Sequence, residues 1–370
     1  MRRRDFLGAV AAGAAVGPGV GAAGAASQGP AVPFRLGMAG LVHGHAGGFL
    51  GQYRDSKEVE LVGIAEPDAE VAGRYARRYK LDPGKIYPSV AAMMDAAKPE
   101  GVVAFTSTVD HGAVVAECAR RKLPVMMEKP LAVSIEQARA IEKAAAGAGI
   151  PVLVNYETTW YPSNHAAAAL ARSRALGEVR KVVIHDGHRG PKEIGCGPEF
   201  LAWLTDPARN GAGALFDFGC YGANLMTWLM DDARPTTVTA VTQRIKPEVY
   251  PNVDDEATIV LEYPKAQAII QASWNWPFDR KDMEIYGRTG QAITVGQDKI
   301  RVRLAGQGEE ARPSPPLAAP EDDFLRYFVA VARGQARPSG LSSLRNNLIV
   351  VEILDAARRS AATGQAIRLA

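Results

Sequence analysis

Short apolar runs alternate with amphipathic stretches between residues 34 and 130. The runs with the length of buried strands are 34–39, 59–65, 101–105 and 124–127. The stretches with the apolar spacing of helices are 69–79, 90–97 and 111–121. Strands that alternate with helices in this way predict βαβ units, and therefore an α/β fold whose first domain has a parallel sheet.

A different pattern follows in the second half of the chain. Apolar and polar positions alternate, as in strands with one covered face, at 179–185, 237–244, 257–263 and 266–274. Residues 310–320 are rich in Pro and Ala and predict a connection, after which helical spacing resumes at 322–333. The pattern therefore predicts a second domain built on its own sheet.

An apolar segment at 213–229, GALFDFGCYGANLMTWL, carries three polar side chains on one helical face. Asp217, Tyr221 and Asn224 are spaced i, i+4 and i+7. Each has an ordinary structural interpretation: a carboxylate at a helix start, a core aromatic ring and a buried amide with partners. The alternative is that this face forms part of a functional site.

The turn after the first predicted strand contains an altered dinucleotide fingerprint. The motif G-x-G-x-x-G, counted from Gly40, places Val42 and His45 where the second and third glycines belong, although Gly44 could serve after a slip in register. Glu66 ends the second strand, where a carboxylate binds the ribose 2′-OH and repels a 2′-phosphate. The pattern favours NAD as cofactor, with NADP less favoured.

The two histidines of this turn also raise the question of a metal site. His43 and His45 are spaced i, i+2, which does not share a helix face, and no carboxylate lies close to them in the sequence. We therefore predict no metal site here.

Two further strand ends carry polar residues at the edge where ligands bind to parallel sheets. The fourth strand is followed by 106–111 (TSTVDH) and the fifth by Glu128-Lys129-Pro130. A lysine beside a cofactor can hydrogen-bond a substrate hydroxyl, and its pKa shifts when it loses water. The alternative is a surface lysine at a strand exit.

The first 31 residues predict an export signal of the twin-arginine (Tat) type. Arg2, Arg3 and Arg4 precede a mildly apolar Ala/Gly/Val run with an A-x-A site at 23–25. Pro18 breaks that run, which argues against a spanning helix, and no Cys lies near the cleavage region, which argues against a lipid anchor. The alternative is an ordinary basic tail.

Charge and cysteine content limit the partners. Loss of the predicted signal removes three arginines and Asp5, so the net charge changes from +3 to +1, and nucleic acid is disfavoured as a partner. Cys118, Cys196 and Cys220 lack the spacing of metal ligands and predict buried thiols, although a disulfide between two of them remains open.

Taken together, these motifs resemble the Gfo/Idh/MocA family of oxidoreductases. Glu128-Lys129-Pro130 resembles its E-K-P motif, and 106–111 resembles its T-P-N-x-x-H strand exit, with Ser107 and Thr108 in place of Pro and Asn. Residues 211–221 resemble its G-G-A-L-x-D-x-G-x-H helix start. Tyr221 stands where many members have His, as in the glucose-fructose oxidoreductase branch.

The resemblance implies a Rossmann domain followed by an α/β domain with an open, mainly antiparallel sheet. The implied divisions are a signal and linker at 1–31, the Rossmann domain at 32–151, a substrate and oligomerisation domain at 152–310, and a helical segment that packs back on the Rossmann domain at 311–370. It also implies a homodimer or homotetramer.

The resemblance further implies a catalytic set of Lys129, Asp217 and Tyr221, with Tyr221 as the acid/base and its pKa lowered by Lys129 and the nicotinamide ring. The expected cofactor contacts are Gly37, Gly40, Val42, His43, Gly44, His45, Glu66, Thr106, Ser107, Thr108, His111, Glu128 and Lys129. The expected substrate contacts are Tyr161, His185, His188, Arg189, Asn224 and Trp274, since aromatic and hydrogen-bonding groups together suit a carbohydrate.

Three functions are compatible with these residues. The first is an exported, periplasmic oxidoreductase that acts on a sugar, polyol or glycoside hydroxyl and keeps its NAD bound, since the Tat translocase carries folded proteins with cofactors in place. The second is a redox-neutral, NAD-dependent glycosidase or lyase that works through a transient keto-sugar. The third is a sugar-binding protein without catalysis, which the altered fingerprint would explain.

Overall fold

The first of two sheets consists of six parallel strands. The computed structural model describes residues 32–369, so the predicted export signal lies outside the described residues. The strands are β1 (Phe34–Ala39), β2 (Val59–Ala65), β3 (Ile86–Tyr87), β4 (Gly101–Ala104), β5 (Val125–Glu128) and β6 (Val152–Asn155). Their order is β3-β2-β1-β4-β5-β6, so successive strands are added on one side of β1 up to β3 and on its other side from β4 onward. Ligands of such sheets bind where the side changes, between β1 and β4, outside the carboxyl ends of the strands.

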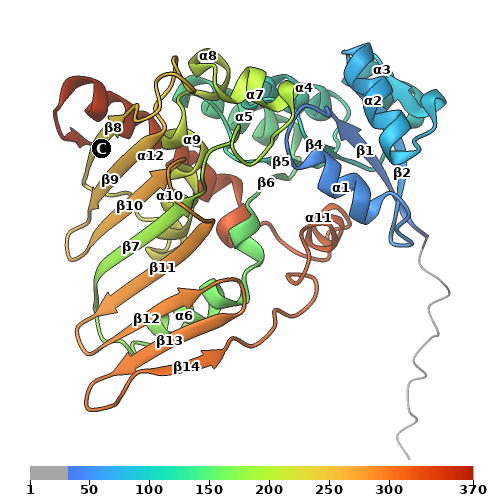
Figure 1. The fold of residues 1–370 in the computed structure, drawn as a ribbon. Helices are drawn as coiled ribbons and strands as arrows, with labels where there is room; N and C mark the ends of the chain where they lie inside the picture. Colours follow the sequence, from blue (N-terminus) through green and yellow to red (C-terminus); the bar gives the residue numbers. More distant parts are fainter. Residues whose placement is uncertain (1–31, 370) are drawn as a thin grey trace, which may run out of the picture. The chain divides into compact units, whose positions relative to one another are not determined.

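Five helices connect these strands, as the alternating pattern predicts (Figure 1). They are α1 (Ala46–Tyr53), α2 (Ala69–Tyr79), α3 (Val90–Ala97), α4 (His111–Arg120) and α5 (Ile135–Ala148). Side-chain caps determine where several of them begin. Asp68 accepts hydrogen bonds from the amides of Glu70 and Val71, and Ser134 accepts one from the amide of Gln137.

The second sheet has nine strands in the order β14-β13-β12-β11-β7-β10-β9-β8-β15. They are β7 (Val179–Gly187), β8 (Thr237–Gln243), β9 (Glu256–Glu262), β10 (Gln267–Ser273), β11 (Arg280–Gly287), β12 (Gly290–Val295), β13 (Lys299–Leu304), β14 (Glu310–Pro313) and β15 (Ile367–Arg368). Only β7 and β10 pair in parallel among these. The predicted fold class, a Rossmann sheet plus a mainly antiparallel sheet, is therefore confirmed. Residues 310–313, which the composition assigns to a connection, instead pair with β13.

The helices after β6 lie either on the second sheet or between it and the first sheet (Figure 1). They are α6 (Pro162–Arg172), α7 (Pro198–Leu204), α8 (Pro207–Asn210), α9 (Ala214–Asp217), α10 (Gly219–Leu229), α11 (Phe324–Ala332) and α12 (Leu344–Thr363). The ring of Phe328 on α11 meets Phe34 on β1 edge to face, 6.0 Å between centroids. The long α12 instead packs against α10, β8 and α5. The two sheets thus share one continuous packing arrangement between Pro33 and the carboxyl end.

Two negative findings apply to residues 32–369. No helix there is both long and apolar enough to cross a membrane. Cys118, Cys196 and Cys220 are all free thiols; the first and third are buried, and burial raises the pKa of Cys118 to about 12.

Candidate active site

The predicted catalytic residues meet at a cavity of about 550 Å³ between the carboxyl edge of the first sheet and the ends of β7 and β11. Its wall includes His43, Gly44, His45, Lys129, Tyr161, His188, Asp217, Tyr221, Arg280 and Lys281. Another cavity, of about 530 Å³, contains none of the predicted site residues. The chemistry is therefore to be sought at the first cavity.

A buried ion pair joins the two sheets at the base of this cavity. Lys129, directly after β5, donates from Nζ to Oδ1 of Asp217 at 2.5 Å and to its backbone carbonyl at 2.9 Å. The two side chains are only 6% and 7% exposed. Burial alone would lower the pKa of Lys129, but the Asp217 carboxylate raises it overall. Burial alone would raise the pKa of Asp217, but the Lys129 ammonium lowers it overall. Both groups are therefore charged.

Trp274 supports this ion pair from beneath. Its indole Nε1 donates to the second carboxylate oxygen of Asp217 at 2.9 Å, and the ring is fully buried. Trp274 was predicted to contact substrate, but it contacts Asp217 instead, because the end of β10 runs under α9 rather than along the cavity wall. Both oxygens of Asp217 are therefore committed, so Asp217 holds Lys129 in position.

Tyr221 lines the cavity above the ion pair. Nζ of Lys129 lies 5.1 Å from the centroid of the Tyr221 ring. Nζ of Lys281, a residue of β11, lies 5.3 Å from the same centroid. No described residue hydrogen-bonds the Tyr221 hydroxyl. Burial, followed by the carboxylate of Glu157, raises the pKa of Tyr221 well above 10. The net lowering expected from Lys129 and the nicotinamide ring is not found in the protein alone, because burial and Glu157 raise the pKa overall, and the resting side chain is a protonated phenol.

Asn224 does not belong to the cavity. The predicted single helix is broken at Phe218, where α9 ends and α10 begins, so Asp217 and Asn224 do not share a helical face. Asn224 is fully buried, and its Nδ2 donates to the carbonyl of Leu341 at 2.8 Å and to Oδ1 of Asn346 at 2.7 Å. The prediction that it contacts substrate is wrong: the side chain is a buried amide whose Nδ2 is satisfied, whereas its Oδ1 has no hydrogen-bond partner among the described residues.

The turn between β1 and α1 contains Gly40 and Gly44, and Gly47 follows in the first turn of α1. Gly40 has a positive φ of 83°, and a Cβ there would lie 2.9 Å from the carbonyl of Phe105. Gly44 is exposed on the cavity, and a Cβ at Gly47 would overlap the hydroxyl of Tyr79 on α2. The spacing is thus G-x-x-x-G-x-x-G, with Gly47 missed by counting from the standard motif. These positions match the turn, the phosphate approach and the helix packing that a dinucleotide requires, so the turn fits NAD.

Other predicted cofactor contacts are engaged with protein groups. Glu66 is buried, and its carboxylate accepts from the amides of Leu41 at 2.8 Å and Asp68 at 3.0 Å. Burial raises its pKa. Gly37 lies within β1 against Met93. The structure therefore places neither residue on the cavity wall.

The segment after β4 is covered by α7 and α8. Thr108 donates to Oδ1 of Asn210 at 3.3 Å, His111 Nδ1 lies 3.2 Å from the carbonyl of Leu131, and Trp203 donates to the carbonyl of Val42 at 3.2 Å. Ser107 is fully buried and donates to Asp110, whereas Thr106 is half-buried. This edge lies under residues 198–210, which sequence spacing cannot reveal because the covering helices come from the second half of the chain.

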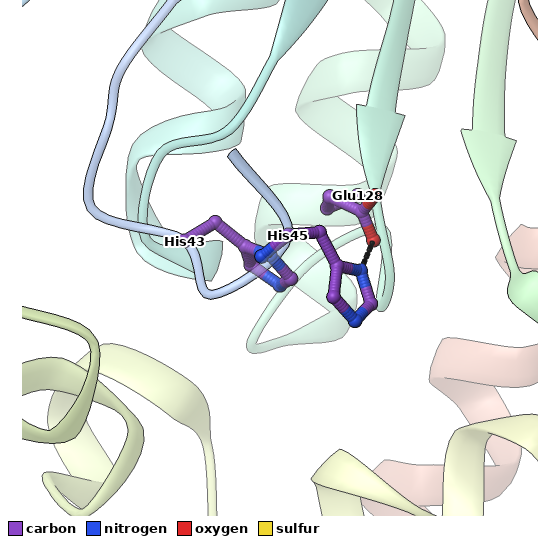
Figure 2. A group of neighbouring side chains, drawn as sticks. All are labelled: His43, His45 and Glu128. Carbon is purple, nitrogen blue, oxygen red and sulfur yellow. Dashed lines mark hydrogen bonds and ion pairs between the residues drawn. The ribbon is translucent and has the colours of Figure 1, made fainter. Parts of the chain in front are cut away.

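The two histidines of the turn lie beside Glu128 (Figure 2). His45 Nδ1 is 3.0 Å from Oε2 of Glu128, whose Oε1 accepts from Nδ2 of Asn155 at 3.0 Å. Burial alone would raise the pKa of Glu128, but His45 and His43 lower it to about 2. No carboxylate lies close to these histidines in the sequence, but β5 delivers one in space from 83 residues away.

The predicted substrate contacts of the second domain divide into two groups. Tyr161 and His188 line the cavity, and the Tyr161 hydroxyl donates to Glu157. His185 instead pairs with Asp282 at 3.0 Å, and Arg189 is exposed away from the cavity wall. Of these four residues only His185 lies on β7; His188 and Arg189 follow the end of that strand, and Tyr161 precedes α6. The wall residues missed by sequence reasoning include Glu157, Cys196, Asp279, Arg280, Lys281 and Gln297. Only Glu157 carried a signal in the sequence, because it lies in the segment after β6.

Asp186 is an unexpected feature next to the cavity. It is fully buried on β7, opposite Lys281 in the register of β11, and no described residue hydrogen-bonds either carboxylate oxygen. Burial raises its pKa well above 3.8, against the opposing charge of Lys281. The folded chain therefore holds Asp186 as a neutral acid.

Replacing Asp186 by asparagine tests this state. Unfolded Asp186 ionises near 3.8 while the folded side chain keeps its proton, so the unfolding free energy of the wild type falls as pH rises above 3.8. We expect the stability of Asp186→Asn relative to wild type to increase from pH 4 to pH 8, by up to about 1.4 kcal/mol per pH unit. Urea denaturation across this range measures it. A difference that does not change with pH would show that Asp186 is ionised.

Comparisons with known proteins agree with this architecture. Residues 34–156 match the family described as "Oxidoreductase family, NAD-binding Rossmann fold", and residues 164–293 match the "GFO/IDH/MocA C-terminal domain". D-apiose dehydrogenase from Paraburkholderia graminis is 23% identical over 340 residues, 86% of each chain. Inositol 2-dehydrogenase from Rhizobium meliloti is 23% identical, over 85% of this chain and 92% of the relative.

Solved structures show the same fold. An inositol dehydrogenase homologue from Azotobacter vinelandii, complexed with NAD+, superposes with a TM-score of 0.79 at 18% identity, over 93% of this chain and 99% of the other. The aldose-aldose oxidoreductase from Caulobacter crescentus, complexed with glycerol, superposes with a TM-score of 0.76 at 22% identity, over 91% and 100%. On the two matched halves and this fold, the chain belongs to the Gfo/Idh/MocA family of NAD-binding oxidoreductases.

Proposed function

We propose that this chain is an exported oxidoreductase that acts on a hydroxyl-bearing carbon of a sugar, polyol or glycoside and keeps its NAD tightly bound. The observation that carries the proposal is the buried Lys129–Asp217 pair beneath Tyr221, at the carboxyl edge of a sheet whose turn fits a dinucleotide. NAD, when bound, accepts a hydride from a carbinol carbon. Gly44 and His45 line the part of the wall that would hold it.

The side chains of this cavity supply the positioning and the proton. Two of the three N–H donors of Lys129 are directed at Asp217, which leaves one for a substrate oxygen. A charged Lys129 stabilises negative charge that develops on that oxygen. The Tyr221 hydroxyl has no hydrogen-bond partner in the described part of the chain, so it can exchange a proton with the same oxygen. Because the resting phenol is protonated, Tyr221 can donate its proton directly to a carbonyl oxygen, which is the direction of carbonyl reduction.

The remaining wall supports a polyhydroxylated substrate. Tyr161, His188, Arg280 and Lys281 bring donors, acceptors and an aromatic ring to one cavity. Hydroxyl groups need both donors and acceptors, whereas sugar ring faces pack on aromatic rings. The named activities of the relatives, on D-apiose and inositol, belong to the same chemical class.

Export explains why the cofactor should stay bound. Tat-dependent transport would deliver a folded chain to the periplasm, where free NAD is not replenished. Trp203 donates to the carbonyl of Val42 in the phosphate turn, so α7 would hinder exchange. We also propose a homodimer or homotetramer, which the family resemblance favours.

Release of the cofactor from purified protein tests the proposal. Protein exported and purified without added nucleotide is expected to release about one NAD per chain on denaturation, and to reduce or oxidise the bound cofactor when sugars or polyols are supplied. Absorbance at the nicotinamide band and enzymatic assay of the supernatant measure both. Protein without nucleotide that also fails to bind added NAD would contradict the redox proposal, and glycoside cleavage without net NADH would identify the redox-neutral reaction instead.

A further inference from the structure

His43, His45 and Glu128 lie at the end of the dinucleotide turn, but neither the glycines of that turn nor the Lys129–Asp217 pair requires two imidazoles beside a buried carboxylate (Figure 2). One ligand atom from each of the three residues lies within 4.8 Å of the other two. All three come from the cavity edge of the first sheet, two from the β1–α1 turn and one from the end of β5. We propose that they bind one divalent transition-metal cation.

The local backbone makes the close pair of histidines possible. His45 is the N-cap residue of α1, and His43 precedes it on the turn, so neither lies within a helix. The i, i+2 spacing therefore does not separate their side chains as it would on a helix. The ring centroids lie 4.7 Å apart, and His45 is 48% exposed on the cavity side. Both imidazoles thus approach Glu128 from one side, as Figure 2 shows.

The charge of Glu128 is the second observation. Its side chain is 3% exposed, and among residues 32–369 no lysine or arginine forms an ion pair with it, because the neighbouring Lys129 is directed at Asp217. A buried carboxylate needs a paired charge to offset the loss of water. In addition, Nε2 of His43 is buried without a hydrogen-bond partner among the described residues. A cation between these atoms would satisfy both groups.

Another group of possible ligands provides a contrast. His185, Asp282 and Glu284 also lie close together on the second sheet. There, however, Arg280 donates two hydrogen bonds to Asp282, and Tyr286 donates to Glu284. Because these carboxylates already have partners, this group carries no proposal.

The donor set determines the class of cation. Two imidazoles and one carboxylate suit Zn²⁺, Fe²⁺, Mn²⁺ or Co²⁺, whereas Ca²⁺ and Mg²⁺ prefer oxygen ligands throughout. Three protein ligands leave open positions, which is typical of catalytic rather than structural sites. These positions would face the cavity that contains Lys129 and Tyr221, where a cation can polarise a substrate oxygen as a Lewis acid.

Binding of a cation depends on the support that Asn155 gives to Glu128 and on the position of the ring proton of His43. Asn155 donates to the other oxygen of Glu128, and its own Oδ1 accepts from Trp160 at 2.9 Å, so the amide is held in the orientation of an outer-shell support. Ligation through Nε2 of His43 requires the ring proton on Nδ1. The 3.2 Å hydrogen bond from the His45 amide to that Nδ1 must therefore open when the cation enters.

Titration with a metal alone tests the site. The full chain, without a histidine tag and after treatment with chelator, is titrated with Co²⁺, followed by visible absorption, and with Zn²⁺, followed by calorimetry. We expect one cation per chain. His45→Ala and Glu128→Gln should abolish binding, and Asn155→Ala should weaken it about 10- to 100-fold. His188→Asn, which changes a histidine of the same cavity outside the cluster, should bind as the wild type does.

Two results would overturn the assignment: a wild-type chain that binds neither cation, or a His45→Ala variant with wild-type affinity. The exposed His45 is the deciding position if Glu128→Gln fails to fold, and circular dichroism checks each variant. No nucleotide or sugar is added in this titration, and its readout is cation binding, not turnover. Its outcome is therefore independent of the redox proposal, which the release of NAD tests separately.

Discussion

Replacing Lys129 by methionine is expected to lower the turnover number about 10²- to 10³-fold, the usual effect of removing one charged donor from a developing oxyanion. The change also leaves the Asp217 carboxylate buried without its cation. Breaking one side of a buried pair typically costs about 3–5 kcal/mol of unfolding free energy. Steady-state kinetics with a sugar substrate and urea denaturation at pH 7 measure the two effects.

The double variant Lys129→Met/Asp217→Asn separates these effects. It removes both charges, and the asparagine oxygen can still accept the indole N–H of Trp274. Stability should recover most of the loss while turnover stays low. If Lys129→Met keeps turnover within tenfold of wild type although the chain is destabilised, the pair is structural and the catalytic assignment of Lys129 is wrong.

Replacing Tyr221 by phenylalanine is expected to lower turnover about 10²- to 10⁴-fold, the range for loss of a positioned acid or base. The ring keeps its packing, including the edge-to-face contact with Tyr156 at 5.4 Å between centroids. Because no described residue hydrogen-bonds the hydroxyl, stability should change by less than about 1 kcal/mol. Stopped-flow reduction of the bound nucleotide measures the chemical step.

Tyr161→Phe provides a matched control for this experiment. Its hydroxyl lies on the same cavity but donates to Glu157, so its loss should raise KM more than it lowers turnover. Full turnover by Tyr221→Phe, with cofactor content unchanged, would show that another group moves the proton. Tyr221→Phe removes the proton donor for carbonyl reduction and the proton acceptor for alcohol oxidation, so both directions of the reaction should be measured.

The periodicity of the chain was sufficient to predict the two sheets. The run 101–105 is apolar at every position, and 34–39 at every position but Arg35, because both faces of a parallel strand are covered, whereas 257–263 alternates because one face is open. The E-K-P motif and the Asp217–Tyr221 spacing also located the ion pair and the phenol correctly. These features depend on local spacing and on one short motif, which a sequence displays directly.

Contacts between distant segments could not be predicted in this way. The break at Phe218 removed Asn224 from the site, and α7 covered the turn at Val42, because both depend on how the second sheet packs against the first. The rise in the pKa of Tyr221 depends on burial and on Glu157, which lies 64 residues away. Glu128 reaches His45 across 83 residues for the same reason. The sequence by itself determined which chemical groups occur and on which elements, and the tertiary structure alone decided which of them share a cavity, lose water and take one another as partners.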